Sequence, residues 1–363
     1  MERIYNFSPG PAVLPMPVLE EAQRDLLCLP GVGVSALEIS HRSPWFEGVL
    51  DETTANLRRL LNMPANYRVL YMQGGSRLQF SMVPMNLLRG TGRSADYIVT
   101  GTWGQMALTE AKREGSVRAA YNSKPTNFDR LPAAGELDLD PKAAYVHFTS
   151  NETIQGVEFL DEPAVGEAPL VCDASSDFLS RPLPIEKYGL IYACAQKNAG
   201  PAGITIVIIR DDLLARSSDE LQSMLNYRLY AEETMPNTPP VFSAYIVLLV
   251  TRWLEKSVGG LQRMYEQNRA KARLLYDVID RSEGFYRGHA QPACRSLMNV
   301  TFRLPDDATQ SAFIKQAEAR GLHYLKGHRS VGGIRASIYN AMPREGVEAL
   351  RDFMLEFHRQ SAK

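Results

Sequence analysis

The amino-acid sequence predicts an α/β fold: a large domain with a mainly parallel seven-stranded sheet flanked by helices, and a smaller α+β domain at the C-terminus. Short runs of β-branched and apolar residues alternate with helical patterns over the first 240 residues or so, as in βαβ units. Several of these runs are apolar almost throughout, which is typical of strands buried on both faces. The length of 363 residues suits one large and one smaller domain.

The strands and helices of the predicted large domain alternate along the chain. The strands are expected at Val69–Met72, Tyr97–Thr100, Val117–Tyr121, Ala144–Thr149, Leu170–Asp173, Leu190–Cys194 and Ile204–Ile209. The helices between and before them are expected at Pro17–Leu27, Trp45–Leu61, Leu78–Leu88 and Gln105–Arg113. This order favours a sheet whose strands run mostly in one direction.

The pattern changes after about residue 240. A long helical region extends from Val241 to about Ser282 and is interrupted at Gly259-Gly260. It is followed by a strand, a helix, a second strand and a last helix, expected at Met298–Arg303, Gln310–Arg320, Ile334–Ile338 and Arg344–Gln360. We therefore assign residues 15–258 to the large domain and 259–363 to the small one, joined by the N-terminal segment 1–14.

The composition argues against several classes of partner. Lys and Arg total 40 and Asp and Glu total 41, so the net charge of −1 gives no electrostatic reason to expect nucleic acid or an anionic membrane. The apolar run Ala244–Val250 is too short to span a bilayer, and the N-terminus lacks the pattern of a secretory signal. We expect a cytoplasmic protein.

The four cysteines form no CxxC pair, and two of them lie in apolar runs. This usage favours buried free thiols in a reducing compartment. No metal site is expected. The cysteines are Cys28, Cys172, Cys194 and Cys294.

Lys197 is the most informative residue. It follows an apolar strand and precedes the Gly/Pro-rich segment Asn198–Gly203. Poor solvation at a buried strand end lowers the pKa of a lysine, which favours a neutral amine able to form a Schiff base with an aldehyde. The alternative is a lysine whose amine reaches the surface.

Asp173 ends another apolar strand, one βαβ step before Lys197. Both side chains can therefore reach one crevice at the carboxyl ends of neighbouring strands. A carboxylate in that position can pair with the ring nitrogen of a pyridine cofactor and keep it protonated. A strand-end turn or a helix N-cap is the alternative for Asp173, and for Ser175 and Ser176 beside it.

Gly74 and Gly75 stand between a predicted strand and a predicted helix. Such glycines leave backbone N–H groups at the helix start free to hold a phosphate, here those of Ser76 and Arg77. A Gly-Gly turn alone is weak evidence. Together with Asp173 and Lys197, in this order and each at a strand end, it describes a site for pyridoxal 5′-phosphate (PLP).

At this point the sequence resembles the class V aminotransferases of the fold-type I PLP enzymes, and more narrowly the phosphoserine aminotransferase branch. The resemblance extends over nearly the whole chain. Its motifs are NFSPGPA at 6–12, EISHR at 38–42, Gly74-Gly75-Ser76-Arg77, SNETIQG at 150–156, AQKNAGPAG at 195–203, NTPP at 237–240 and GHRSVGGIRASIYNA at 327–341.

The resemblance implies a role for each cofactor residue. Lys197 is expected to bind the cofactor covalently and Asp173 to pair with its ring nitrogen, while Trp103 stacks on the ring and Thr153 bonds the phenolic oxygen. The phosphate is expected on Ser76, Arg77 and Gln196, and on Asn237 and Thr238 of the neighbouring subunit, which implies a homodimer. Without the resemblance, Trp103 is equally well a core residue and Asn237-Thr238 an ordinary loop.

The resemblance also implies how substrates bind. Arg335 is expected on the α-carboxylate. A distal phosphate is expected on His41, Arg42, His328 and Arg329 with Arg77 nearby, His328 and Arg329 coming from the partner subunit. Arginine suits both groups because its guanidinium makes two-point hydrogen bonds. Any one of these cations taken singly is otherwise a surface residue.

The implied reaction is the reversible transfer of an amino group between L-glutamate and 3-phosphonooxypyruvate, which gives O-phospho-L-serine and 2-oxoglutarate in L-serine biosynthesis. A longer phosphorylated oxo acid of pyridoxine biosynthesis, with 4-phosphonooxy-L-threonine as its product, is a second expected substrate. Two positions depart from the family pattern: Ser76 stands where a glycine is expected, and Ala174 follows Asp173 where a larger apolar residue is usual.

Three alternatives remain open at this point. One is a class V enzyme for unphosphorylated oxo acids, such as a serine– or alanine–glyoxylate aminotransferase. A second is a cysteine desulfurase, which is disfavoured because no cysteine is expected in an exposed loop. The third is a PLP-binding protein without turnover.

Overall fold

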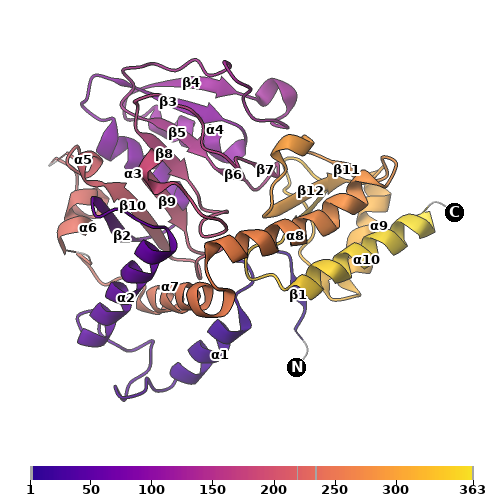
Figure 1. Cartoon of the computed structure of the whole chain (residues 1–363), viewed down its shortest axis with the longest axis horizontal. Helices are drawn as coiled ribbons and strands as arrows, with labels where there is room; N and C mark the ends of the chain where they lie inside the picture. The colour runs from indigo at the N-terminus through magenta and orange to yellow at the C-terminus, as the bar shows by residue number, and fades with distance from the viewer. Residues whose placement is uncertain (1–2, 219, 234, 362–363) are drawn as a thin grey trace.

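The computed structural model describes residues 3–218, 220–233 and 235–361. Figure 1 shows a large central sheet with helices packed against it, and a smaller group of strands and helices beside it that carries the C-terminus. Within the described ranges, no helix is both long enough and apolar enough to cross a membrane.

The central sheet has seven strands, and it is mostly parallel as predicted. Only β10 runs against its two neighbours, β2 and β9. The order across the sheet is β2 (Tyr67–Gln73), β10 (Ile204–Arg210), β9 (Tyr188–Cys194), β8 (Leu170–Asp173), β5 (Val146–Thr149), β3 (Ser94–Val99) and β4 (Ser116–Asn122). Since β2 and β9 are both antiparallel to β10, β2 runs in the same direction as β9 and β8, and their carboxyl ends lie at the same edge.

Helices cover both faces of this sheet, which explains the apolar runs in its strands. In β10, Ile206 and Ile208 pack into the core beneath one set of helices, while Val207 and Ile209 pack into the core on the other face. The first face carries α1 (Met16–Asp25), α2 (Pro44–Leu60) and α7 (Val241–Trp253). The second carries α3 (Ser76–Leu87), α4 (Thr102–Ala111), α5 (Asp211–Leu214) and α6 (Tyr227–Glu233).

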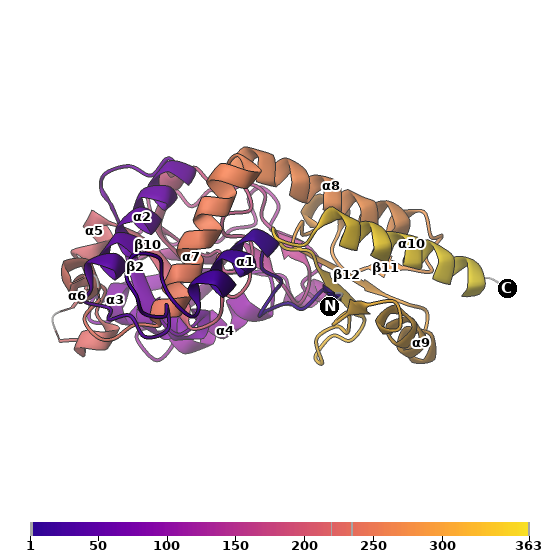
Figure 2. The same cartoon turned by 90° about the horizontal axis from the view of Figure 1, so that it is seen from below.

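The C-terminal part has its own three-stranded antiparallel sheet and a separate core. Figure 2 shows its helices set apart from those of the central sheet. Its elements are α8 (Leu261–Asp280), β11 (Arg287–Gly288), β12 (Asn299–Arg303), α9 (Asp307–Glu318), β13 (Leu322–His323), β14 (Ile334–Ser337) and α10 (Arg344–Ser361). The predicted division of the chain at residue 259 remains a prediction.

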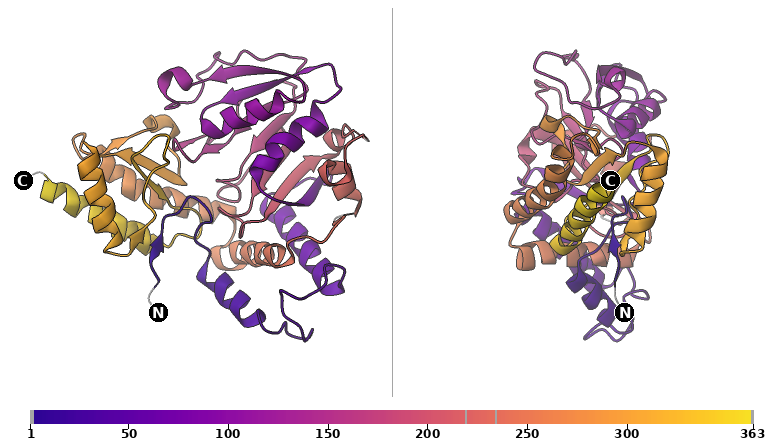
Figure 3. Two further views of the ribbon diagram at one scale, coloured as in Figure 1. Left: turned by 180° about the vertical axis from the view of Figure 1, so that it is seen from behind. Right: turned by 90° about the vertical axis from the view of Figure 1, so that its right-hand side faces the viewer.

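The glycine pair that was expected to interrupt the long helix does so. A π-helical turn (Leu254–Val258) follows α7, and Gly259 and Gly260 then adopt φ values of 89° and 100° before α8 begins. These positive φ angles are open to glycine at little cost. The N-terminus also crosses to the C-terminal part, where β1 (Tyr5–Asn6) pairs in parallel with β13. Figure 3 shows from behind the indigo N-terminal segment beside the C-terminal part.

One cysteine contradicts the expectation of buried thiols. Cys172, Cys194 and Cys294 are buried, but Cys28 is exposed in the loop after α1. The α1–α2 connection folds over the surface, and local sequence does not reveal this. The argument that no cysteine is exposed, used above against a desulfurase, is therefore wrong.

Candidate functional site

A cavity of about 480 Å³ lies where the carboxyl ends of β2, β8 and β9 meet. It gathers most of the residues singled out in the sequence, although they come from distant parts of the chain. Those that line it are Ser76, Arg77, Trp103, Thr153, Asp173, Gln196, Lys197, His328 and Arg335.

Lys197 lies just beyond the end of β9, against the N-terminal segment. A Cβ atom at Gly10 would come within 3.4 Å of the Lys197 Cγ, so the chain passes close to the base of this lysine. Burial lowers the pKa of Lys197, but Tyr339, Cys194 and Asp173 outweigh it and leave the pKa above its ordinary value. The expected lowering of this pKa is thus wrong for the protein without a cofactor, because the acidic groups near the amine favour its charged form by more than burial disfavours it.

Asp173 is buried at the end of β8 and is held by Ser175. The backbone N–H of Ser175 donates to Asp173 Oδ1 over 3.0 Å, and its hydroxyl donates to the same oxygen. Ser76 in turn bonds the Ser175 hydroxyl. Burial raises the pKa of Asp173, while Lys197 and the Ser175 hydrogen bonds oppose that rise. Asp173 thus makes the strand-end turn that was one of its alternatives, and it also lines the cavity.

The turn before α3 has the shape of an anion cradle. Gly74 has a φ of 90°, and its backbone N–H donates to the Gly203 carbonyl over 3.0 Å. Gly75 is the N-cap residue of α3 and has no side chain that could bond the first N–H groups of the helix. These N–H groups are therefore available to an anion in the cavity. The Gln196 side chain also lies there: its Nε2, a donor that can bond an anion, is 3.9 Å from a Cβ atom built at Gly75.

Trp103 belongs to the cavity and not to the core alone. Its indole N–H donates to Thr153 Oγ1 over 2.9 Å, and the Lys197 Nζ lies 5.7 Å from its ring centroid. A ring next to the amine can stack on a planar cofactor. Because Thr153 Oγ1 accepts from the indole, its own proton is free for an acceptor in the cavity.

Arg335 is a buried cation in the same cavity. One of its terminal nitrogens lies 3.4 Å from the Thr153 carbonyl, and its Nε has no partner among the described residues. Burial lowers the pKa of this guanidinium, which Tyr339 partly offsets. A buried guanidinium with an unused N–H group is suited to a carboxylate.

His328 lies beside Arg335 in the cavity of its own chain. Burial lowers the pKa of His328, and the positive charges of Arg335 and Arg329 lower it further. This position differs from the expectation that His328 serves the partner subunit. The loop between β13 and β14 turns back towards its own sheet, which the sequence did not predict.

Five predicted residues lie outside this cavity. His41 and Thr238 line a separate groove of about 490 Å³, and the Thr238 carbonyl accepts from Gln73 Nε2 over 3.0 Å. Neither the cavity nor the groove is lined by the other three residues, Arg42, Asn237 and Arg329.

Several residues of the site have no role in the sequence prediction. Glu152 accepts hydrogen bonds from the N–H groups of Trp103 and Gly104, and Tyr339 faces Lys197 and donates to the Pro9 carbonyl over 2.8 Å. Asn198, next to Lys197, accepts from the N–H of Asn340 over 3.0 Å. All lie inside the motifs quoted above, but spacing alone does not say which polar residue of a motif faces the cofactor.

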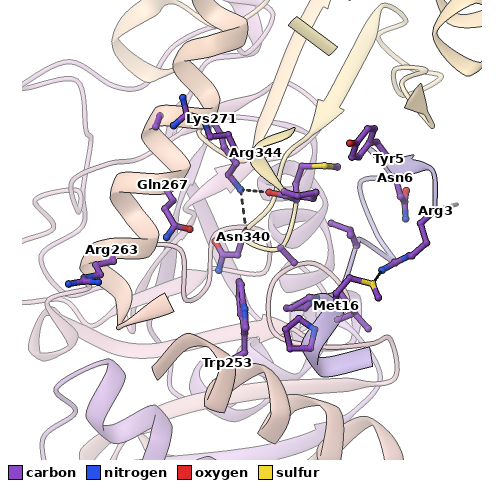
Figure 4. Close-up of a pocket in the computed structure, with 18 of the residues that line it drawn as sticks. Arg3, Tyr5, Asn6, Met16, Trp253, Arg263, Gln267, Lys271, Asn340 and Arg344 are labelled. Atoms are coloured by element: carbon purple, nitrogen blue, oxygen red, sulfur yellow. Dashed lines mark hydrogen bonds between the residues drawn. The ribbon is translucent and has the colours of Figure 1, made fainter. Parts of the chain in front are cut away.

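A larger cavity of about 930 Å³ lies elsewhere, between the N-terminal segment, α8 and the loop before α10. Figure 4 shows Trp253, Asn340 and Lys271 around it. The Lys271 Nζ lies within hydrogen-bond distance of four backbone carbonyls, those of Ile338, Tyr339, Asn340 and Met342, which share its N–H donors. Burial lowers the pKa of Lys271 to about 7, but among the described residues the lining of this larger cavity includes no aspartate beside the amine, whereas the smaller cavity places Asp173 with Lys197.

The smaller cavity fits a phosphorylated pyridine aldehyde. It offers an amine for the aldehyde, a buried carboxylate for a ring nitrogen and uncapped N–H groups for a phosphate. The ring face of Trp103 is available to stack on such a ligand, and the buried Arg335 is available to a substrate carboxylate.

Comparisons with known proteins agree with this geometry. The family described as aminotransferase class-V matches residues 4–350. A phosphoserine aminotransferase of Rhodopirellula baltica is 54% identical over 358 residues, covering 98% of this chain and 95% of that protein.

Solved structures give the same result. The phosphoserine aminotransferase of Bacillus circulans subsp. alkalophilus has a TM-score of 0.97 at 48% identity and covers 99% of this chain and 100% of its own. A PLP-bound phosphoserine aminotransferase from Trichomonas vaginalis has a TM-score of 0.92 at 41% identity, with 97% and 100% covered.

Proposed function

The chain belongs to the class-V aminotransferase family, and we infer that it is a phosphoserine aminotransferase, which moves an amino group between L-glutamate and 3-phosphonooxypyruvate. The products are O-phospho-L-serine and 2-oxoglutarate, on the route to L-serine. The observation that carries this function is one cavity in which Lys197 and Asp173 lie with the guanidinium groups of Arg77 and Arg335 and the imidazole of His328.

The cofactor is pyridoxal 5′-phosphate, and the residues present suit it. We assign the phosphate to the start of α3 and to Gln196, the ring nitrogen to Asp173, the ring face to Trp103 and the phenolic oxygen to the Thr153 hydroxyl. When bound, the cofactor withdraws electrons from the substrate Cα and so makes its proton acidic.

The side chains of this chain then divide the work. Arg335 fixes the α-carboxylate and with it the orientation of the Cα–H bond. The Lys197 amine would take the proton from the substrate Cα and deliver it to the C4′ carbon of the cofactor. Asp173, held by Ser175, keeps its partner nitrogen protonated, and this charge is needed throughout the cycle.

We propose that the active enzyme is a homodimer in which His41, Arg42, Asn237 and Thr238 serve the site of the partner subunit. His41 and Thr238 share a groove outside their own cavity. Arg42 is exposed, so it can reach another copy. In this arrangement His328 and Arg77 of one subunit face His41 and Arg42 of the other across the substrate phosphate.

Substrate competition tests the function. Glutamate consumption is measured with 3-phosphonooxypyruvate, pyruvate and glyoxylate. We expect the kcat/KM for the phosphorylated acid to exceed the other two by about a thousand-fold or more, because the cations that bind the phosphate are left unpaired by the others. Similar values for all three would favour an enzyme for unphosphorylated oxo acids.

Mixed dimers test the shared site. Lys197→Ala and Arg42→Ala homodimers should each have low activity with 3-phosphonooxypyruvate. Equal amounts of the two variants are mixed, unfolded and refolded together. If Arg42 serves the partner, each mixed dimer has one intact site and roughly a quarter of the normal activity returns. If Arg42 serves its own subunit, no mixed dimer has an intact site and no activity returns.

We further propose that the enzyme accepts the longer phosphorylated oxo acid that gives 4-phosphonooxy-L-threonine, and that it acts in the cytoplasm. The relatives named above support only the serine-pathway reaction, so the second substrate needs its own assay. The four cysteines, all free, suit a reducing compartment. Fractionation of cells that express a tagged chain would test the location.

A further inference from the structure

The start of helix α4 is capped by a residue that lies 50 positions away in the sequence. Glu152, on the short strand β6 (Asn151–Glu152), accepts from the Trp103 N–H over 2.9 Å and from the Gly104 N–H over 2.7 Å. The N-cap residue Gly101 provides no side-chain cap of its own. We propose that Glu152 is a positioning residue, which fixes the Trp103 ring beside the catalytic Lys197.

Two neighbouring residues hold Trp103 at both of its N–H groups. Glu152 takes the backbone N–H, and Thr153 takes the indole N–H over 2.9 Å. Because both acceptors belong to one strand end, the backbone and the ring of Trp103 cannot shift independently of each other. The ring is thus fixed where its centroid lies 5.7 Å from the Lys197 Nζ.

The glycines around the carboxylate show how closely it is fitted. A Cβ atom at Gly101 would lie 2.3 Å from the Glu152 Cδ, and one at Gly104 would lie 3.2 Å from its Oε1. Gly101 has an extended backbone with φ of −176°, which any residue can adopt. Its lack of a side chain therefore serves the approach of Glu152 and not the backbone conformation.

Burial opposes the charge of Glu152, so its role as an anchor rests on its two hydrogen bonds and on the close fit of Gly101 and Gly104. A carboxylate at a helix N-terminus is favourable because it satisfies two free N–H groups and faces the positive end of the helix dipole. Glu152 is fully buried, and burial raises its pKa to about 7. The two N–H bonds oppose this rise. Of the nearby charges, that of Asp173 raises the pKa and that of Lys197 lowers it.

The test replaces Glu152 with its neutral isostere. In Glu152→Gln one of the two acceptor oxygens becomes an NH₂ group, which faces a backbone N–H and cannot bond it. The matched control is Glu158→Gln in the same hairpin, since β7 (Val157–Glu158) pairs with β6. Glu158 is also a buried carboxylate, and it accepts from the Leu297 N–H, away from α4.

The first readout needs no cofactor and no turnover. The sequence has three tryptophans, Trp45, Trp103 and Trp253. In a background with Trp45→Phe and Trp253→Phe, the fluorescence of the apoprotein reports on Trp103 alone. We expect Glu152→Gln to raise its acrylamide quenching rate about two-fold, because the ring gains freedom, and Glu158→Gln to leave that rate unchanged.

The second readout rests on the proposed function and uses the holoenzyme. We expect Glu152→Gln to lower kcat about ten-fold and to weaken the visible circular dichroism of the bound cofactor, with less than a two-fold change in the KM for glutamate. Failure of the wild-type chain to aminate 3-phosphonooxypyruvate would remove the proposed function but leave the fluorescence test valid.

A second variant breaks the same contact without touching Glu152. In Gly101→Ala the new methyl group displaces the carboxylate, and Gly48→Ala in α2 is its control because no atom lies within 4 Å of the added Cβ. Gly101→Ala should reproduce both effects, and it carries the test if Glu152→Gln does not fold. A folded Glu152→Gln or Gly101→Ala variant with unchanged Trp103 quenching and unchanged kcat would overturn the proposal. The same changes in quenching and kcat in the control Glu158→Gln would also overturn it.

Discussion

At the residue scale, two buried carboxylates near Lys197 differ in what they contact: Asp173 lines the cavity, whereas Glu152 bonds the backbone of Trp103. Asp173 is bonded by a serine hydroxyl and by one N–H group and faces Lys197, whereas Glu152 caps a helix. The first is therefore free to act on a ligand, and the second is committed to the protein.

Asp173→Asn should keep the cofactor bound and lower kcat by two to four orders of magnitude, because an amide cannot hold a ring nitrogen in its protonated state. Absorbance of the bound cofactor and steady-state rates measure the two effects. Asp177→Asn is the control: Asp177 is also buried but bonds Ser150. Near-normal turnover in Asp173→Asn would remove the carboxylate from the ring nitrogen.

Glu152 also predicts a dependence of stability on pH. Its pKa is raised from 4.5 to about 7 in the folded apoprotein, so between these values the folded state binds more protons than the unfolded state. The free energy of unfolding should fall by up to about 3 kcal/mol as the pH rises from about 4.5 to about 7. Urea unfolding of the apoprotein and of Glu152→Gln measures this; parallel curves for the two would contradict the shift.

At the element scale, the turn between β2 and α3 separates two roles of glycine. Gly74 has a positive φ, and a Cβ there would also lie 3.2 Å from Leu78. Gly75 has an extended backbone and lines the cavity. The first glycine shapes the turn, and the second leaves room for the ligand.

Gly74→Ala should lower the free energy of unfolding of the apoprotein by about 1–2 kcal/mol through backbone strain. Gly75→Ala should leave that value nearly unchanged and weaken cofactor binding instead, because its methyl group enters the cavity. Denaturation of the apoprotein and equilibrium titration with the cofactor separate the two variants. Equal stability losses would show that both glycines serve the backbone.

The elements themselves were largely predictable from the sequence, including the starts of α7 and α10 at Val241 and Arg344, but the starts of α3 and α4 were not. All seven strands of the central sheet were found, because runs such as Ile204–Arg210 are apolar on both faces. Helices α3 and α4 begin before the predicted residues, at Ser76 and Thr102. Their first turns are defined by Gly75 and by Glu152, and a contact from a distant strand leaves no local pattern.

At the scale of the whole molecule, a buried lysine joins the C-terminal part to the site. The Lys271 Nζ on α8 bonds the carbonyls of residues 338–340 and of Met342. The Asn340 N–H donates to Asn198, which is next to Lys197. Lys271→Met should lower the free energy of unfolding by about 3 kcal/mol, since the buried carbonyls that share its N–H groups lose their donor. Urea unfolding measures it, with the exposed Lys315→Met as control; equal, small effects would contradict this role.

The sequence by itself determined the fold class, the family and the residues Lys197, Asp173 and Arg335, because apolar periodicity and ordered motifs are local properties. Only the tertiary structure decided which of these residues meet. It brought His328 to its own cavity, left His41 and Thr238 in a separate groove, raised the pKa of Lys197 and gave Glu152 a helix to cap. Each of these outcomes depends on the distance between groups far apart in the chain, and that distance is set by packing.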